Sequence, residues 1–216
     1  VIKMYPGTRS IIEMGGEDSK LILLETKESR SLLEDFAMNS MCAAGTGSFL
    51  DQQAKRIGVS IVKEFGELAL KSENPPRIAG RCSVFAKTDM IHLQQIATPV
   101  YDIVAGLCFA VARNFKSNLA MGKEIEKPVI FQGGVAANHG VVRAFREILH
   151  LSGDDLIIPE HHASMGAIGS IYHVADNSID GIPFKGIDEL KEYLKSDRSE
   201  SEHLEPLHRP DIAYNK

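Results

Sequence analysis

The chain has 216 residues, of which 44% are hydrophobic and 25% are charged, an ordinary globular composition that can bury a core without disulfides or a structural metal. Its net charge of −5, without any stretch rich in Lys and Arg, gives no electrostatic support for nucleic acid or a membrane as partner, and its longest apolar run, residues 103–112, is too short to span a bilayer. The three cysteines are too few and of the wrong parity for a disulfide framework, which predicts a cytoplasmic protein.

The chain is predicted to begin with an antiparallel meander of three strands. Two apolar runs, residues 9–14 and 20–25, flank a four-residue turn at 15–18, a pattern typical of a hairpin. A third strand is expected over residues 33–38.

Helices are predicted in the middle of the chain, where apolar residues recur at helical spacing and prolines mark the ends of segments. The expected segments are helices over 48–57 and 61–71, extended chain over 78–85, a helix from Thr88 or Asp89 to about 96, and the longest helix from Pro99 to about 120.

The second half of the chain alternates strands and helices. The expected segments are a strand over 129–131, a helix over 141–149, a strand over 156–158 and a helix over 163–175. This alternation implies parallel strands joined by right-handed crossovers. We therefore predict one α/β domain over residues 1–176, in which an antiparallel hairpin meander is followed by βαβα units. Residues 177–216 are predicted as a short helix, 187–195, and a polar tail or linker.

Three glycine-rich segments are candidate binding residues, and each stands where a strand gives way to a turn or helix. They are Gly15-Gly16, Gly45-Thr46-Gly47 and Gly133-Gly134. Because Gly has no Cβ, backbone N–H groups there can approach a phosphate or a nucleoside closely. Any one of them is more often a structural turn, but three in a short chain favour a shared nucleotide site. The chain has neither a Walker lysine nor a GxGxxG motif to name the nucleotide.

Five ordered motifs together resemble one family. They are Glu13–Lys20, Met38–Gly47, Arg81–Ala86, Gln132–Asn138 and Ala163–Ala167. They resemble the BadF/BadG/BcrA/BcrD-type ATPases, which activate 2-hydroxyacyl-CoA dehydratases or drive benzoyl-CoA reductases and belong to the sugar kinase, heat-shock ATPase and actin superfamily. The resemblance implies a ribonuclease-H-like, actin-like fold whose two lobes clasp ATP and Mg²⁺. This chain is similar to the second lobe and lacks the acidic phosphate loop of the first, so the isolated chain is expected to be inactive.

The same resemblance assigns nucleotide-binding and catalytic residues. It aligns Gly15 and Gly16 with a second phosphate loop, and the turn residues Gly133, Gly134, Ala136 and Asn138 with the adenosine contact. Glu17 and Asp18 are the catalytic candidates that it implies.

Asp18 matches the family, whereas Glu17 stands where the family more often has Gln and Glu13 where it more often has Asp. A carboxylate at position 17 can act as a base but also repels the γ-phosphate, so its role in hydrolysis stays open.

Cys42 and Cys82 are candidate metal ligands. Each precedes a helix entry, where the helix dipole favours a thiolate, although two isolated cysteines are more often unliganded. The resemblance implies that cysteines at these positions in each of two subunits hold one 4Fe-4S cluster, which requires a homodimer. Cys108 lies in an apolar helical stretch and is predicted to be a core residue.

The leading hypothesis is therefore a fragment of an ATP-dependent, iron–sulfur electron-transfer activator of an acyl-CoA dehydratase or reductase. ATP binding and hydrolysis would close and open the lobes and change the geometry around the cluster. Two alternatives stay open: a sugar- or acetate-kinase-like phosphotransferase lobe, and a non-catalytic assembly fragment. The phosphotransferase needs an acceptor pocket with a catalytic Asp, and no motif suggests one.

Overall fold

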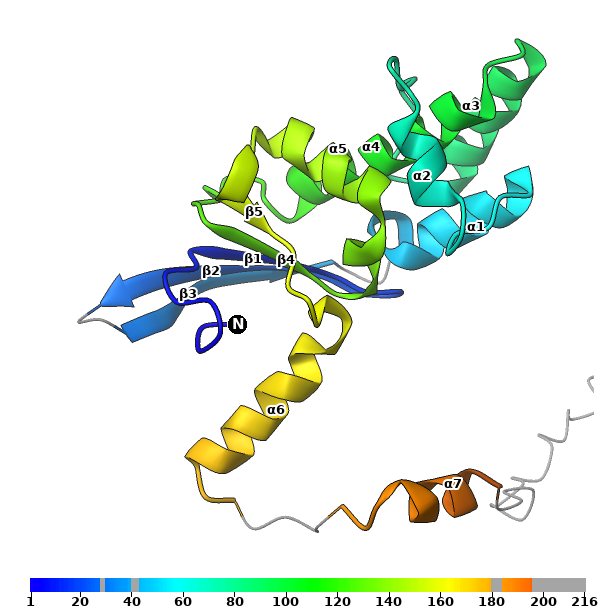
Figure 1. The fold of residues 1–216 in the computed structure, drawn as a ribbon. Coiled ribbons are helices and arrows are strands. Elements are labelled where there is room, and N and C mark those ends of the chain that lie inside the picture. Colours follow the sequence, from blue (N-terminus) through cyan, green and yellow to red (C-terminus); the bar gives the residue numbers. More distant parts are fainter. Residues whose placement is uncertain (28–29, 40–42, 180–183, 196–216) are drawn as a thin grey trace, which may run out of the picture. The chain divides into compact units, whose positions relative to one another are not determined.

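The computed structural model describes residues 1–27, 30–39, 43–179 and 184–195, and a five-stranded mixed sheet forms its centre (Figure 1). The strands are β1 (Ser10–Met14), β2 (Ser19–Lys27), β3 (Arg30–Met38), β4 (Val129–Gln132) and β5 (Leu156–Ile157). They lie in the order β3-β2-β1-β4-β5. β2 pairs antiparallel with both β1 and β3, whereas β1 pairs parallel with β4 and β4 with β5. The predicted meander followed by βαβα units is confirmed.

Helices α1 to α5 lie over one face of this sheet (Figure 1). The helices are α1 (Gly47–Ile57), α2 (Phe65–Leu70), α3 (Ser83–Gln95), α4 (Val100–Asn118), α5 (His139–Leu149), α6 (Met165–Asp176) and α7 (Ile187–Lys195). Short 3-10 turns are η1 (Ala43–Gly45), η2 (Gly134–Ala137), η3 (Gly153–Asp155) and η4 (His162–Ser164). The main core lies between the sheet and α1, α2, α4 and α5.

The long helix α4 runs through the centre of this core. Cys108 on α4 is fully buried, and burial raises the pKa of its thiol to about 12. The prediction that Cys108 is a core residue is confirmed by this burial in the main core cluster, where a thiol with a raised pKa is unreactive.

The opposite face of the sheet carries a smaller apolar cluster. Ile11, Leu24 and Ile130 form it, and Val1 and Tyr5 of the N-terminal segment pack against it. Both faces of the central strand β1 are therefore covered by apolar side chains.

The chain divides into two compact units, residues 1–173 and 174–216. The first holds the whole sheet. In the second, the helix predicted over 187–195 is confirmed as α7, while the predicted tail, 196–216, lies outside the described residues. No helix in the described part of the chain is both long and apolar enough to cross a membrane.

The prediction of extended chain over residues 78–85 is wrong beyond Cys82, where α3 begins. Cys82 is the N-cap of α3, with extended backbone angles (φ −148°, ψ 127°). Asp89, expected as a cap, lies inside the helix, where its carboxylate accepts a hydrogen bond from the N–H of Ala79 at 2.8 Å. Phe85, a strand-like residue by type, is 65% exposed on the first turn of the helix. Asp89 thus binds the loop that precedes α3 and does not cap the start of the helix.

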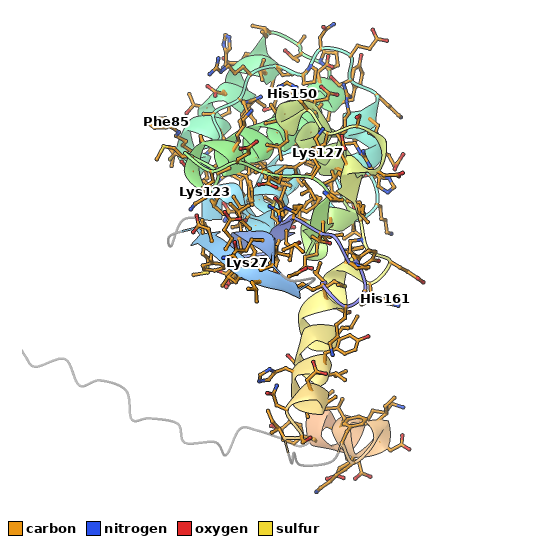
Figure 2. All side chains as sticks on the ribbon, turned by 90° about the vertical axis from the view of Figure 1, so that its left-hand side faces the viewer. Lys27, Phe85, Lys123, Lys127, His150 and His161 are labelled. Atoms are coloured by element: carbon orange, nitrogen blue, oxygen red, sulfur yellow. The ribbon has the colours of Figure 1, made fainter. Side chains whose placement is uncertain are left out.

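Replacing Phe145 with Ala is expected to lower the free energy of unfolding by about 3–5 kcal/mol, as measured by urea denaturation. Phe145 of α5 is fully buried and packs edge-on against Phe115 and Phe131, with ring centroids 5.3 and 4.9 Å away. The matched control is Phe85→Ala at an exposed position (Figure 2), which should change stability by no more than about 0.5 kcal/mol. Equal effects of the two substitutions would contradict this packing.

Candidate functional site

The carboxyl ends of β1 and β4 bring two of the predicted glycine turns together. The strands pair in parallel with Glu13 opposite Gln132, so the turns that follow them leave the sheet at the same edge, where ligands of α/β sheets bind. Gly133 has a φ of +95°, and a Cβ on it would lie 2.3 Å from the carbonyl oxygen of Met14. Only glycine fits there. A Cβ on Gly134, by contrast, would meet no atom within 4 Å.

The third glycine segment joins this edge through the start of α1. The N–H of Gly47 donates to the carbonyl of Gly15 at 2.9 Å, and the N–H of Ser48 to that of Gly16 at 2.8 Å. A Cβ on Gly47 would lie 2.9 Å from Cγ2 of Val135. These two N–H groups are therefore engaged by the turn at 15–16, and Gly47 allows all three segments to meet.

Three of the residues predicted to bind the nucleotide lie behind this junction. A Cβ on Gly45 would lie 2.9 Å from Oδ1 of Asn114 on α4. Thr46 is fully buried as the N-cap of α1, and Ala136 is 2% exposed. These three residues are thus buried in the core next to the junction.

A cavity of about 380 Å³ opens beside the junction, a volume typical of small-molecule sites. Gly134 and Asn138 line it from the predicted turn, and Gly47 lines it from α1. Further lining residues are Leu50, Ile61, Val62, Lys63, Val135 and Ala137. The wall is thus mostly apolar, with a few polar groups.

Sequence reasoning missed the wall between α1 and α2. The helix predicted over 61–71 begins only at Phe65, because the preceding residues form a turn in which the N–H groups of Glu64 and Phe65 both donate to the carbonyl of Ser60 at 3.0 Å. This turn places Val62 at the surface, 89% exposed, where it lines the cavity. The helical spacing of the apolar residues hid the turn, and no local motif marks it.

The start of α5 forms the other side of the cavity. Oδ1 of Asn138 accepts from the N–H of Val141 at 3.2 Å and so caps α5. A Cβ on Gly66 would lie 3.3 Å from the same Oδ1, so α2 approaches this cap closely. At the exposed rim, Nδ1 of His139 lies 3.2 Å from a carboxylate oxygen of Glu67.

A polar group is half-buried where β1 and β4 end. The Glu13 carboxylate accepts from Nζ of Lys20 at 2.9 Å and from Nε2 of Gln132 at 2.7 Å. Burial alone would raise the pKa of Glu13, but the hydrogen bonds from Lys20 and Gln132 and the charge of Lys20 outweigh it and lower that pKa. Oε1 of Gln132 is buried and has no hydrogen-bond partner within the described residues. This edge therefore offers an unused acceptor.

Glu17 and Asp18 lie at the exposed tip of the turn after β1. The turn is closed by the Gly15 N–H, which donates to the carbonyl of Asp18 at 2.8 Å, and Nζ of Lys20 lies 3.8 Å from the Asp18 carboxylate. Both carboxylates are accessible from the same edge of the sheet.

Cys82 is half-buried at the N-cap of α3, whereas Cys42 lies outside the described residues. Asn39 and Gly45, which lie three residues before and three residues after Cys42, line a hollow of about 590 Å³ together with Arg81, the neighbour of Cys82. Cys82 itself lines an adjoining hollow of about 970 Å³, which Arg81 also lines. No group of three His, Cys, Asp or Glu side chains suited to a metal occurs among the residues that the structure describes. Described residues near each of the two cysteines thus line the same hollow.

The ion pair of Glu13 predicts a pH dependence of stability. Because the folded pKa is lowered, the Glu13 carboxylate stabilises the fold above the unfolded pKa of about 4.5, and this contribution disappears as the pH falls through the folded pKa. Glu13→Gln should therefore lower the free energy of unfolding at pH 7. The difference in this free energy between the variant and the wild type should become smaller as the pH falls below about 4.5. Urea unfolding at several pH values measures this. A difference in the free energy of unfolding that does not change with pH would contradict the lowered pKa of Glu13.

This mixed sheet, with glycine turns and a cavity at its carboxyl edge, has the fold of an actin-like ATPase lobe. Residues 1–169 match the model of the BadF/BadG/BcrA/BcrD ATPase family, and the chain belongs to this family. It is 39% identical to the 2-hydroxyisocaproyl-CoA dehydratase activator of Clostridioides difficile, over 81% of this chain and 63% of the relative. It is 35% identical to the (R)-2-hydroxyglutaryl-CoA dehydratase activating ATPase of Acidaminococcus fermentans, over 76% and 61%.

Two solved structures of activators resemble this chain in fold as well as in sequence. The activator of the 2-hydroxyisocaproyl-CoA dehydratase from Clostridium difficile with bound ADPNP matches with a TM-score of 0.70 and 34% identity, over 83% of this chain and 66% of that one. Component A of the (R)-2-hydroxyglutaryl-CoA dehydratase from Acidaminococcus fermentans matches with a TM-score of 0.71 and 32% identity, over 80% and 63%. The chain thus spans less than two thirds of the length of these relatives.

Proposed function

We propose that this chain is part of an ATP-dependent, iron–sulfur electron-transfer activator of an acyl-CoA dehydratase or reductase, and that residues 1–176 form one lobe of its nucleotide-binding unit. The observation that carries the proposal is the cavity at the junction of the glycine turns. The named activities of the relatives support it. Because the chain spans only 63% of the first of them, the activity, substrate and partner of the whole protein belong to the proposal.

The cavity suits the adenosine of ATP or ADP. Leu50, Val62 and Val135 provide apolar surface for a base, and the amide of Asn138 and the ammonium of Lys63 provide hydrogen-bonding groups. The open space at Gly134 lets a ligand reach the backbone there.

The edge beside Glu13 suits the phosphates and their Mg²⁺. Mg²⁺ prefers oxygen ligands and retains several waters, so the unused Oε1 of Gln132 and the carboxylate of Glu13 fit as acceptors for such waters. When bound, Mg²⁺-ATP supplies the hydrolysable phosphate bond and the metal neutralises its charge. Asp18 and Glu17, exposed on the adjoining turn, can accept a proton from an attacking water.

Cys42 and Cys82 fit the thiolate donors of a 4Fe-4S cluster, which takes four thiolates. With two cysteines from each chain, a cluster requires a homodimer. The hollow that the flanks of both cysteines share supports a common site. When bound, the cluster supplies the electron for the partner dehydratase or reductase, and a reducing cytoplasm would keep the cysteine ligands as thiols before assembly.

Gly134→Val is expected to weaken ADP binding at least about tenfold, because a branched side chain would project from the wall of the cavity. The fold should persist, since a Cβ at this position meets no atom within 4 Å. An NMR titration with ADP measures the affinity. The control is Gly169→Val on α6, also in open space, which should bind ADP as wild type does. Unchanged ADP affinity of the Gly134 variant would refute the adenosine site.

The cysteine proposal predicts different fates for the three thiols. After anaerobic reconstitution, Cys42→Ser and Cys82→Ser should each lose iron and visible absorption, because a shared four-thiolate cluster would lose one ligand from each subunit and Ser replaces a thiolate poorly. Cys108→Ser, at a fully buried position, should keep the iron and lose about 1–3 kcal/mol of stability. Iron analysis and absorption spectra decide. Full iron content in both Cys42→Ser and Cys82→Ser would contradict the assignment.

A further inference from the structure

A single residue, His162 of η4, binds both polar backbone groups of Gly133. The N–H of Gly133 donates to the His162 carbonyl at 2.8 Å. In return, Nδ1 of the His162 ring lies 3.0 Å from the Gly133 carbonyl oxygen, 29 residues away in sequence. Because a carbonyl oxygen can only accept, Nδ1 carries the hydrogen. The histidine side chain is therefore a specific donor to the turn after β4.

This bond fixes the direction of the next N–H group. The Gly133 carbonyl and the Gly134 N–H belong to one planar trans peptide and point in opposite directions. A peptide between two glycines rotates easily because no Cβ restricts it. The Gly133 carbonyl also accepts from the N–H of Ala136, at 3.2 Å, so His162 provides the shorter of two bonds that hold this peptide.

The peptide that His162 holds forms part of the cavity wall, since Gly134 lines the cavity. The backbone of His162 is itself held, because its N–H donates to the carbonyl of Pro159 at 3.0 Å. The hydrogen bond to Pro159 therefore fixes the backbone that carries the His162 ring. His162 does not line the cavity, so its effect on a ligand there is exerted through the peptide.

We propose that His162 is a positioning residue for nucleotide binding: its Nδ1–H sets the orientation of the Gly133–Gly134 peptide that the nucleotide meets. This inference rests on the proposed function, in which the cavity takes the adenosine of ATP or ADP. It adds a residue outside the cavity on which the affinity depends.

The test compares replacements that differ in where they carry an N–H. Asn places its amide N–H close to the position of Nδ1, Gln places it farther out, and Leu has none. His161→Leu is the control, because His161 is the exposed neighbour (Figure 2). Each variant is made in the full chain of 216 residues, and its thermal midpoint is recorded to verify folding.

The ADP affinity and the orientation of the Gly134 N–H are expected to change in the same variants. In NMR titrations with ADP, His162→Leu and His162→Gln should weaken binding about threefold to tenfold, the loss of one hydrogen bond, while His162→Asn and His161→Leu should bind as wild type does. In the ligand-free protein, the residual dipolar coupling of the Gly134 N–H should change in the Leu and Gln variants and stay unchanged in the Asn variant.

Wild-type orientation of the Gly134 N–H in folded His162→Leu or His162→Gln protein would overturn the inference, as would failure of Asn to restore it. Unchanged ADP affinity alongside an altered orientation would overturn the claim for nucleotide binding. If the wild type does not bind ADP, the proposed function fails, and the ligand-free coupling still decides whether His162 positions the peptide.

Discussion

The close approach of Gly133 to the end of β1 is the contact on which the site depends. A Cβ at this position would lie 2.3 Å from the carbonyl oxygen of Met14, so any other residue would push the turn after β4 away from β1. With glycine there, both turns leave the same edge of the sheet, and the carbonyl of Gly15 reaches the N–H of Gly47 at 2.9 Å. The cavity exists because these backbones touch.

The buried Oε1 of Gln132 lowers the stability of this edge, although the neighbouring Glu13 carboxylate raises it. Glu13 is bonded to Lys20 and Gln132, yet Oε1 of Gln132 stays buried without a partner within the described residues. An unsatisfied buried acceptor costs about 1–3 kcal/mol, and an apolar residue in its place would avoid this cost. Such a feature is expected where a ligand completes the hydrogen bonding.

Local patterns predicted most of the fold but only part of the site. Alternating and helical spacing predicted the strands and most of the helices, because burial of one face imposes those periods. The start of α3 was mispredicted, since Asp89 bonds to Ala79, a tertiary contact that no spacing encodes. The turn that places Val62 in the cavity wall was also missed, because its apolar residues recur at the spacing of a helix. Likewise Ala136, within a correctly predicted turn, faces the core, because a 3-10 turn points successive side chains in different directions.

Hydrogen bonds also connect the turn after β1 to both flanks of Cys42. Oδ1 of Asn39 accepts from the Ser19 N–H at 2.8 Å, and Nδ2 of Asn39 donates to the carbonyl of Glu17 at 3.3 Å. The hydroxyl of Ser19 donates to the carbonyl of Gly45 at 2.5 Å. These bonds form a contiguous network between the turn and both flanks of Cys42. His162 makes the equivalent connection from Gly133 to η4, so the two turns that would hold the nucleotide are each bonded to a segment outside the cavity.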